Sequence, residues 1–546
     1  MENAQLPVDL IHWILALLPI VVLLVLMVNL RWTAPQAGPM GMFTAAAVAL
    51  LAFATPWETV AVASAKGVWD AIFILYVVWP ALLLYRVTDQ AGGYDALRQG
   101  ITRFSRNELF IVVALGWVFS SFLQGIAGFG TPIAIVAPLL VAYGVRPVYA
   151  VAIPIIAHLW AKFFGTLGVS WFATQQVVEL TDPATTAFQS GLLLIIPCVL
   201  GGFTVVWMYG KWPAVRHAWP LVLIIATIQG VGQALLAPVT PVLCTFLAGS
   251  AAVLALYPLS RWKRYAEPPQ GIVERPAMRD DGPANLDDRP APMSLAMSFV
   301  PYVILSVVAV AVLAIKPLNE ALGAFRIGMP FPAVTTGYDV GNAAVSAYSP
   351  FAPLTHPGTF LLATAALTWL VFRAHGYYRQ WSTGEGPSIL RGLVSDAVPA
   401  SVPVIAFLAM ARLMDHSGQN DVLALGIAAV APAYVFAFLA NGIGALGAFM
   451  TSSSTSSNVL FSNLQSTVAE LKGLPQSAII AAQSAGGSIG NAIAPANVVL
   501  GASTAGIAGQ EGAVLRKTLP WTIVAVIVTG IATVLLVMLT GGVRQP

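Results

Sequence analysis

Eight consecutive polar side chains interrupt an apolar part of the chain at residues 451–458, which read Thr-Ser-Ser-Ser-Thr-Ser-Ser-Asn. Each carries a hydroxyl or an amide group, and apolar helical patterns precede and follow the run. Between hydrocarbon-spanning segments, non-helical polar backbone is tolerated only where protein buries it or where it lines a watery cavity. We therefore expect the run to line a cavity at membrane depth that binds a small polar solute. The alternative is that the small side chains only let helices pack closely.

A second polar tip is expected at residues 125–132, where three glycines precede Thr131 and Pro132. Glycine lets the chain turn and lets the backbone approach a ligand closely. Helices that end at such a tip leave backbone groups unpaired, and the N–H groups of a helix N-terminus suit a carboxylate. The hydroxyls of the run at residues 451–458 would then bind a second polar group of the same solute.

His158 and Lys162 are spaced i, i+4 and share one helix face, just before the glycine-containing segment at residues 163–168. Ionisable residues inside membrane spans are costly and default to functional hypotheses. Lys162 would supply a positive charge for an anionic solute, and His158 would take up a proton near neutral pH. Alternatively, the Lys162 side chain extends to an interface and His158 bonds a backbone carbonyl.

Arg412 and Asp415 are spaced i, i+3 at the end of the apolar segment at residues 399–413. They form either a structural ion pair at the membrane edge or a functional pair, in which Arg412 holds a carboxylate and Asp415 titrates. Asp396, near the start of the same segment, is a further candidate for a proton site. Asp70 lies at the end of another apolar segment and is expected to be solvated or interfacial.

The composition indicates which solvent surrounds these residues. The 546-residue chain is 58% hydrophobic and only 9% charged, whereas a soluble domain carries about 25% charged residues. Such a low share of charged residues cannot cover a water-facing surface. The solvent around the protein must therefore be lipid. We expect an all-α polytopic membrane protein with about 12–14 transmembrane helices, since stretches near the spanning length of about 20 residues recur. The clearer stretches are residues 10–30, 69–85, 295–315, 399–413 and 521–539.

The remaining composition argues against several classes of function. The net charge of +3 is small and scattered, so a nucleic-acid partner is not expected. Cys198 and Cys244 lie in apolar segments and are interpreted as core residues rather than as a disulfide or metal ligands. The sequence contains neither a P-loop nor the motif H-E-x-x-H. We therefore expect the protein not to be an enzyme, and we expect no metal and no cofactor.

The chain divides into two halves with matching internal patterns. A polar stretch at residues 261–292 is predicted to be a flexible cytoplasmic linker between membrane halves at residues 1–260 and 293–546. Each half contains a unit with a polar tip, a Gly/Pro turn and an interrupted helix, at about residues 108–170 and 421–505. Basic loop residues mark the cytoplasmic side, and by this rule the units begin on opposite sides. The fold is therefore predicted to hold two inverted repeats with re-entrant hairpins and broken helices, a pattern that indicates a transporter site.

The predicted substrate site combines the two tips, the two interrupted helices and the buried cations. Its residues are Gly128, Gly130, Thr131, Lys162, Arg412, Ser452, Ser453, Ser454, Thr455, Ser456, Asn458, Gln483, Ser484, Ser488 and Asn491. The candidates for proton coupling are His158, Asp396 and Asp415. One alternative is a sodium-coupled carboxylate symporter, in which carbonyl and hydroxyl oxygens hold Na⁺. Another is an anion channel with a pore lined by Ser and Thr.

Three segments of the chain closely resemble the bacterial L-lactate permease family. They are residues 125–132 (GIAGFGTP), 452–465 (SSSTSSNVLFSNLQ) and 483–497 (QSAGGSIGNAIAPAN). The resemblance extends over nearly the whole chain and implies a multi-pass protein of the bacterial inner membrane that imports lactate, and often glycolate, together with protons. It also implies inverted repeats with re-entrant hairpins and broken helices around the substrate. The hypothesis is thus a proton-coupled importer of short 2-hydroxymonocarboxylates, whose partners are the monocarboxylate, the proton and the lipid bilayer.

Overall fold

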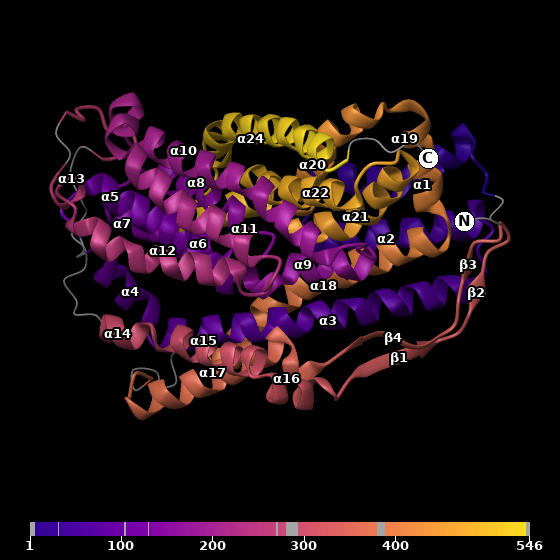
Figure 1. The fold of residues 1–546 in the computed structure, drawn as a ribbon, viewed down its shortest axis with the longest axis horizontal. Helices are drawn as coiled ribbons and strands as arrows, with labels where there is room; N and C mark the ends of the chain where they lie inside the picture. Colours follow the sequence, from indigo (N-terminus) through magenta and orange to yellow (C-terminus); the bar gives the residue numbers. More distant parts are fainter. Residues whose placement is uncertain are drawn as a thin grey trace.

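The protein is almost entirely helical in the part of the chain that the structure describes. This structure, a computed structural model, describes residues 6–30, 32–102, 105–128, 130–268, 271–279, 293–378 and 388–541. Most helices run along the long axis of the molecule (Figure 1). Within the described ranges, nine helices are long and apolar enough to cross a membrane, and four shorter apolar helices accompany them. The predicted all-α polytopic fold is confirmed.

The N-terminal half contains the first unit, which we define as residues 108–177. Before it lie α1 (Leu10–Leu24), the π-helix η1 (Val25–Asn29), α2 (Ala34–Ala52), α3 (Trp57–Gln90) and α4 (Gly93–Thr102). The first unit comprises α5 (Glu108–Val113), the π-helix η2 (Ala114–Phe119), α6 (Ser120–Ile126), α7 (Thr131–Ala142), α8 (Pro147–Ala157), the 3-10 helix η3 (Leu159–Ala161) and α9 (Gly165–Val177). After it lie α10 (Pro183–Ala226), the π-helix η4 (Thr227–Val231), α11 (Gly232–Leu236), α12 (Cys244–Arg261) and α13 (Lys263–Ala266).

The C-terminal half contains the second unit, which we define as residues 433–504. Before it lie α14 (Leu295–Ser298), α15 (Val300–Ala314), α16 (Lys316–Gly323), β1 (Ile327–Phe331), β2 (Val334–Thr335), β3 (Gly341–Asn342), β4 (Val345–Phe351), the 3-10 helix η5 (Pro353–Thr355), α17 (Pro357–Ala374), α18 (Ile389–His416) and α19 (Gln419–Val430). The second unit comprises α20 (Ala433–Thr451), α21 (Ser454–Leu471), α22 (Gln476–Gly490), the 3-10 helix η7 (Asn491–Ile493) and α23 (Pro495–Thr504), and α24 (Glu511–Leu539) follows.

The sequence explains where several of these helices begin. Asp9 caps α1, because its carboxylate accepts hydrogen bonds from the backbone N–H groups of Ile11 and His12 at 2.9 Å. Proline occupies the first position of α8 and of α10, where its missing N–H costs nothing. Helix α10 is interrupted at Gly210 and Lys211, so the long apolar run Pro183–Leu236 supplies two segments of spanning length.

Four helices form what we call the scaffold layer: α18 packs against both α2 and α3, and α17 packs against α3. Helix α3 runs along the lower part of Figure 1, with α17 and the strands beside it. A Cβ added at Gly67 of α3 would lie 2.4 Å from the Cα of Ala409 on α18, so only glycine permits this close crossing. The strands form antiparallel pairs, β1 with β4 and β2 with β3. The Trp69 indole on α3 donates a hydrogen bond to the Ser349 carbonyl on β4, at 3.4 Å, which holds this hairpin along α3.

The two units lie against the scaffold layer and against each other. Helix α9 of the first unit contacts α21 of the second, while α9 also contacts α3 and α21 also contacts α18. Helices α20 and α22 pack together, and α24 covers them (Figure 1). The interface between scaffold layer and units therefore passes between α3 and α18 on one side and α9 and α21 on the other.

Within the predicted linker, residues 277–279 pack against the first unit, whereas residues 271 and 273–275 are exposed. The N–H of Arg146 donates to the carbonyl of Ala277 at 2.7 Å, and the N–H of Arg279 donates to the carbonyl of Gly144 at 2.8 Å. Ala277 and Met278 are fully or almost fully buried. This segment therefore closes over the turn between α7 and α8, whereas residues 269–270 and 280–292 of the linker lie outside the described residues.

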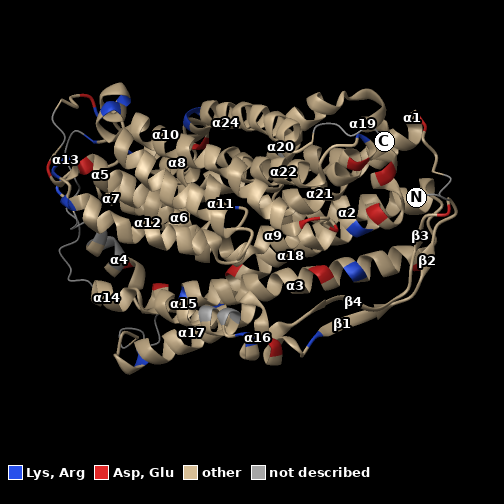
Figure 2. Cartoon of the chain, viewed as in Figure 1, with Lys and Arg blue, Asp and Glu red and all other residues tan. Residues whose placement is uncertain are grey.

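Charged side chains are sparse along the middle of the molecule and gather near its ends, most clearly beside α13 and α5 (Figure 2). Helix α3 is a clear exception, since it carries acidic and basic residues well inside its length. Lys66 and Asp70 are both buried there. Burying a charge is expensive unless it is paired, so their partners mark a site of interest.

Candidate functional site

Both predicted polar tips are breaks between two helices. In the first unit, α6 ends at Ile126 and α7 begins at Thr131, after Gly130 in a left-handed conformation (φ +87°) that favours glycine. In the second unit, α20 ends at Thr451 and the break consists of only Ser452 and Ser453. The expectation that the whole run at residues 451–458 is non-helical is therefore wrong, because residues 454–458 form the first turn and more of α21.

The break in the second unit is built by its own hydroxyl groups. Ser452 has a φ of 55°, and Ser453 caps α21 by accepting a hydrogen bond from the N–H of Ser456 at 3.2 Å. Serine side chains favour such caps because they satisfy helix N–H groups that lack intrahelical partners. The Ser452 hydroxyl also accepts from the N–H of Ala496, at 3.2 Å, which connects this tip to the start of α23.

The two predicted interrupted helices are also present. In the first unit, the chain leaves α8 at His158, passes η3 and enters α9, where Thr166, Leu167 and Gly168 have φ values of 51°, 51° and 79°. Left-handed backbone at non-glycine residues is strained, and such strain clusters at functional sites. In the second unit, the interruption begins later than expected, at η7. Gln483, Ser484 and Ser488 remain within α22.

The two tips and the first interrupted helix meet inside the protein. The Ser170 hydroxyl on α9 lies 3.1 Å from the Ser454 hydroxyl and 2.7 Å from the Thr455 hydroxyl at the second tip. At the first tip, a Cβ added to Gly128 would lie 2.3 Å from the hydroxyl oxygen of Thr166, so Thr166 packs directly on this glycine. Helix η3 contacts α22 of the other unit. Sequence positions almost 330 apart thus form one buried polar region, which we call the tip region.

Several predicted site residues hold the tip region together through hydrogen bonds to one another. Asn458 donates to the carbonyl of Ser454 at 2.9 Å and accepts from the Ser484 hydroxyl at 3.1 Å. Gln483 donates to the carbonyl of Ser457 at 3.1 Å. Asn491 donates to the carbonyl of Gly487 at 2.8 Å. These amides fix the positions of α21 and α22, because a buried polar group without a partner would cost free energy.

Lys162 and His158 lie in the interruption of the first unit and lack partners in the part of the chain that the structure describes. Lys162 is 7% exposed, and its ammonium group makes no hydrogen bond or ion pair there. His158 has no exposed surface, and neither ring nitrogen has a hydrogen-bond partner among the described residues. The same holds for the side-chain oxygen of Gln124. Buried hydrogen-bond donors and acceptors that have no protein partner are suited to binding a small polar anion.

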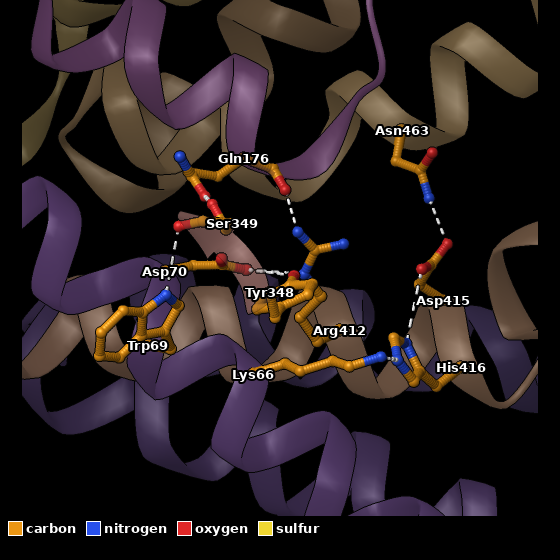
Figure 3. Close-up of polar contacts among 10 residues, drawn as sticks. All are labelled: Lys66, Trp69, Asp70, Gln176, Tyr348, Ser349, Arg412, Asp415, His416 and Asn463. Carbon is orange, nitrogen blue, oxygen red and sulfur yellow. Dashed lines mark hydrogen bonds and ion pairs between the residues drawn. The ribbon is translucent and has the colours of Figure 1, made fainter. Parts of the chain in front are cut away.

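Arg412 does not pair with Asp415, so that prediction is wrong; it pairs with Asp70. The Arg412 Nε lies 2.7 Å from Asp70 Oδ2, which also accepts a hydrogen bond from the Tyr348 hydroxyl at 3.1 Å (Figure 3). Arg412 further donates to the backbone carbonyl of Gln176 on α9. Asp70 has no exposed surface, so its expected interfacial position is also wrong. The 34-residue α3 continues through this position, which places the carboxylate inside the protein.

Asp415 belongs to a second group of contacts beside the first. Its Oδ1 accepts a hydrogen bond from the Asn463 amide on α21 at 2.7 Å, and its Oδ2 lies 3.6 Å from Nδ1 of His416. The other ring nitrogen of His416, Nε2, lies 3.1 Å from the Lys66 Nζ (Figure 3). The ammonium group of Lys66 also lies over the ring of Tyr348, 5.2 Å from its centroid.

Together these contacts form what we call the interfacial network. Its members are Lys66, Asp70, Gln176, Tyr348, Arg412, Asp415, His416 and Asn463. It spans the interface, because Arg412 reaches Gln176 on α9 and Asp415 reaches Asn463 on α21. Lys66 and His416 were not expected at the site from the sequence. The signal for Lys66 was available, since it lies four residues before Asp70 on one face of an apolar helix.

Asp396, the remaining candidate for a proton site, lies apart from both regions. Its Oδ2 lies 2.6 Å from a terminal nitrogen of Arg86 and 2.7 Å from the Arg86 Nε, and both side chains are partly exposed. Sixteen residues of α18 separate it from Arg412, a distance of about 24 Å along a helix. The structure thus gives Asp396 a local ion pair between α3 and α18.

Comparison with known proteins gives this arrangement a family. The family model described as L-lactate permease matches residues 12–540. The chain belongs to the L-lactate permease family. Among curated relatives, the glycolate permease GlcA of Escherichia coli (strain K12) is 27% identical, and the alignment covers 96% of this chain and 95% of the relative. The L-lactate permease of Salmonella typhi is 25% identical over the same shares of the two chains.

A further relative and one solved structure are similar to most of the chain. The L-lactate permease of Escherichia coli (strain K12) is 26% identical over 96% of this chain. A solved crystal structure of the Alcanivorax borkumensis YdaH transporter covers 87% of each chain at 16% identity, with a TM-score of 0.42. With nine candidate spans in its described residues, this member of the L-lactate permease family is a multi-pass bacterial membrane protein.

Proposed function

We propose that this protein is a secondary active transporter that imports L-lactate and related short 2-hydroxymonocarboxylates, including glycolate, by proton symport. Membership of the L-lactate permease family and the names of its relatives, permeases for L-lactate and for glycolate, support the substrate class. The bacterial inner membrane is the expected location.

The observation that carries this proposal is the contact of one short segment with both tips. Within nine residues, from Lys162 to Ser170, the chain presents a buried cation, packs Thr166 on Gly128, and reaches Ser454 and Thr455. A 2-hydroxymonocarboxylate has one carboxylate and one hydroxyl group on adjacent carbons. Lys162 matches the carboxylate through a charge-assisted hydrogen bond, and the Ser and Thr hydroxyls match the hydroxyl group.

The backbone of the tip region adds donors to this site. The residues directly after Ser453 lie at the N-terminus of α21, where N–H groups without an intrahelical partner carry a partial positive charge. This N-terminus would therefore favour the anion, while Ser456 and Ser488 add further hydroxyl groups. Selection between lactate and glycolate would rest on one methyl group, a contact that discriminates by about 1–3 kcal/mol.

The two units support a mechanism of alternating access. The turn between α7 and α8 of the first unit is covered by residues 277–279. The corresponding turn of the second unit lies at the other end, where the Gln476 amide donates to the carbonyl of Glu179, at 3.0 Å, in the loop after α9. Helices α7 and α21 accordingly lie toward opposite ends of Figure 1. In our proposal the units are inverted copies that move together against the scaffold layer.

The test is uptake of radiolabelled L-lactate into proteoliposomes that contain the purified protein, in sodium-free buffer, with and without an inward proton gradient. Proton symport predicts concentrative uptake that a protonophore abolishes. Uptake that requires sodium instead would identify a sodium-coupled symporter. Uptake that only equilibrates and ignores both gradients would identify a channel or a uniporter.

A further inference from the structure

We infer that His416, hydrogen-bonded to Lys66, is the residue that carries the coupled proton. This inference rests on the proposed symport and names the group that couples the proton to the substrate. Unlike His158 and Asp396, His416 contacts the charged groups beside the interface, namely Lys66 on α3 and Asp415, which itself accepts a hydrogen bond from Asn463 on α21.

A single hydrogen atom lies between Nζ of Lys66 and Nε2 of His416. At 3.1 Å, Nζ of Lys66 and Nε2 of His416 are hydrogen-bonded, and a lysine ammonium group is only a donor. While Lys66 is charged, His416 Nε2 accepts, so the imidazole is neutral and carries its proton on Nδ1, which lies 3.6 Å from Asp415 Oδ2 and has no hydrogen-bond partner among the described residues. This tautomer follows from the hydrogen-bond network. A second proton, taken from water, would bind at Nε2 and replace the Lys66 hydrogen bond.

The surrounding charges are balanced before such a proton binds. The network holds two cations, Lys66 and Arg412, and two anions, Asp70 and Asp415, so its charge is balanced while His416 is neutral. Helix α19 adds Asp421, which interacts with Asp415 and with Glu470 of α21. Helices α2 and α9 carry no titratable side chain over their lengths, and Tyr348 of β4 is a hydroxyl donor to Asp70. One added proton gives the network one positive charge, equal and opposite to a bound monocarboxylate.

Protonation of His416 would act on the contacts that cross the interface. Lys66 lies one helical turn from Asp70 on the same face of α3. Once its ammonium group has lost the His416 acceptor, it competes with Arg412 for the Asp70 carboxylate. Asp70 is the residue that holds Arg412, which in turn bonds the Gln176 carbonyl on α9. At the same time, a charged His416 would attract Asp415, which bonds Asn463 on α21. The proton would therefore weaken both links between α18 and the moving units.

His158 is a poorer carrier for a physical reason. No described carboxylate is paired with His158, whereas Asp415 Oδ2 lies 3.6 Å from Nδ1 of His416. His158 also lies within the first unit rather than at the interface with the scaffold layer. In this scheme His158 and Lys162 belong to the substrate site, and His416 belongs to the proton site.

The experiment compares His416→Gln with the wild type in proteoliposomes that enclose a pH-sensitive dye. Glutamine can accept from Lys66 but cannot carry a proton. In the wild type, external L-lactate should acidify the interior. In His416→Gln, the lactate-dependent acidification and concentrative uptake should be lost, while exchange of external labelled lactate for internal lactate persists. His356→Gln, another buried histidine in the scaffold layer, is the matched control and should acidify as the wild type does.

Each other outcome has a defined meaning. If His416→Gln acidifies the interior in proportion to the lactate transported, the assignment of His416 is overturned, and loss of acidification in His158→Gln alone would overturn it as well. Wild-type protein that transports lactate without moving protons would overturn the proposed symport and this inference together. Lys66→Gln gives a second readout if His416→Gln does not fold. Removal of the neighbouring cation should shift the pH of half-maximal lactate accumulation upward, and an unchanged pH profile would contradict the assignment.

Discussion

The carboxylate of Asp70 lies 2.7 Å from the guanidinium group of Arg412, although 342 residues separate them in the sequence. Asp70 is fully buried, and the side chain of Arg412 is 15% exposed. This pair joins α3 to α18 inside the scaffold layer and aims the Arg412 side chain at the Gln176 carbonyl on α9. A buried ion pair adds little net stability compared with apolar residues, yet removal of one partner leaves an uncompensated charge. The ion pair therefore serves to position the Arg412 side chain rather than to stabilise the fold.

Removal of Asp70 alone should be strongly destabilising. We expect Asp70→Ala to lower the free energy of unfolding by about 3–5 kcal/mol, because Arg412 then remains buried without its anion. The double variant Asp70→Ala/Arg412→Met should recover more than half of that loss. Asp396→Ala on α18 is the control, since its ion pair with Arg86 is partly exposed and should contribute about 0–1 kcal/mol. Thermal unfolding in detergent measures all three.

This prediction has a clear counter-result. A double variant that is no more stable than Asp70→Ala would mean that the loss comes from the cavity left by the carboxylate and not from the unpaired guanidinium. The destabilisation would then be a packing effect, and the pair would have no special role in positioning Arg412.

Lys162 should determine the affinity for the substrate. If its ammonium group binds the carboxylate, Lys162→Ala should raise the Kd for L-lactate more than tenfold, a loss of about 1.4 kcal/mol. Lys162→Arg should retain part of the affinity, because it keeps the charge with a different geometry. Isothermal titration or a scintillation proximity assay on purified protein gives the Kd directly.

The control for this prediction is Lys472→Ala. Lys472 lies at the end of α21 and donates to the Ala428 carbonyl at 2.7 Å, away from the tip region. Unchanged lactate affinity in a well-folded Lys162→Ala protein would assign Lys162 a structural role.

The hydroxyl groups of the second tip should contribute to binding without holding the fold. Ser454→Ala/Thr455→Val removes both hydroxyls that contact Ser170 while it nearly keeps their volume. We expect weaker lactate binding with an unchanged unfolding temperature. Thr467→Ala, farther along α21, is the control, because its hydroxyl bonds only the carbonyl of Asn463 on its own helix. Wild-type affinity in the double variant would make this tip a packing element.

The sequence predicted the local features of the site better than its long-range pairs. Glycine and hydroxyl residues at 125–132 and 451–458 indicated the two tips because turn and cap chemistry is local. The burial of Asp70 was missed because it depends on α18, β4 and α9 together, which no local pattern reveals. The same reason explains why Arg412 was paired with Asp415, its neighbour three residues along the helix, when its partner lies on α3.

The sequence also did not reveal how many residues each break between helices contains. Eight polar residues in a row favour an irregular segment, yet Ser453 caps a helix that runs through the rest of them. In lipid a helix satisfies its own backbone groups, so the chain stays helical wherever a cap permits. Likewise, polarity suggested a flexible linker at residues 261–292. The backbone of Ala277 and Arg279 nevertheless bonds the turn between α7 and α8.

The packing of the second unit offers a sharp test of its geometry. Helices α20 and α22 approach so closely that a Cβ added at Gly486 would lie 1.8 Å from the carbonyl oxygen of Asn441. Gly486→Ala must therefore separate the two backbones, and we expect it to cost more than about 3 kcal/mol, the upper end for overpacking. Gly442→Ala on α20 is the matched control, since nothing lies within 4 Å of its added Cβ. Alanine is the better helix former by about 1 kcal/mol, so Gly442→Ala should keep or raise the unfolding temperature.

Because α22 carries Gln483 and Ser484 to the tip region, Gly486→Ala should also weaken lactate binding in whatever fraction folds. A Gly486→Ala protein with wild-type stability and affinity would mean that α20 and α22 do not pack in this way in the membrane.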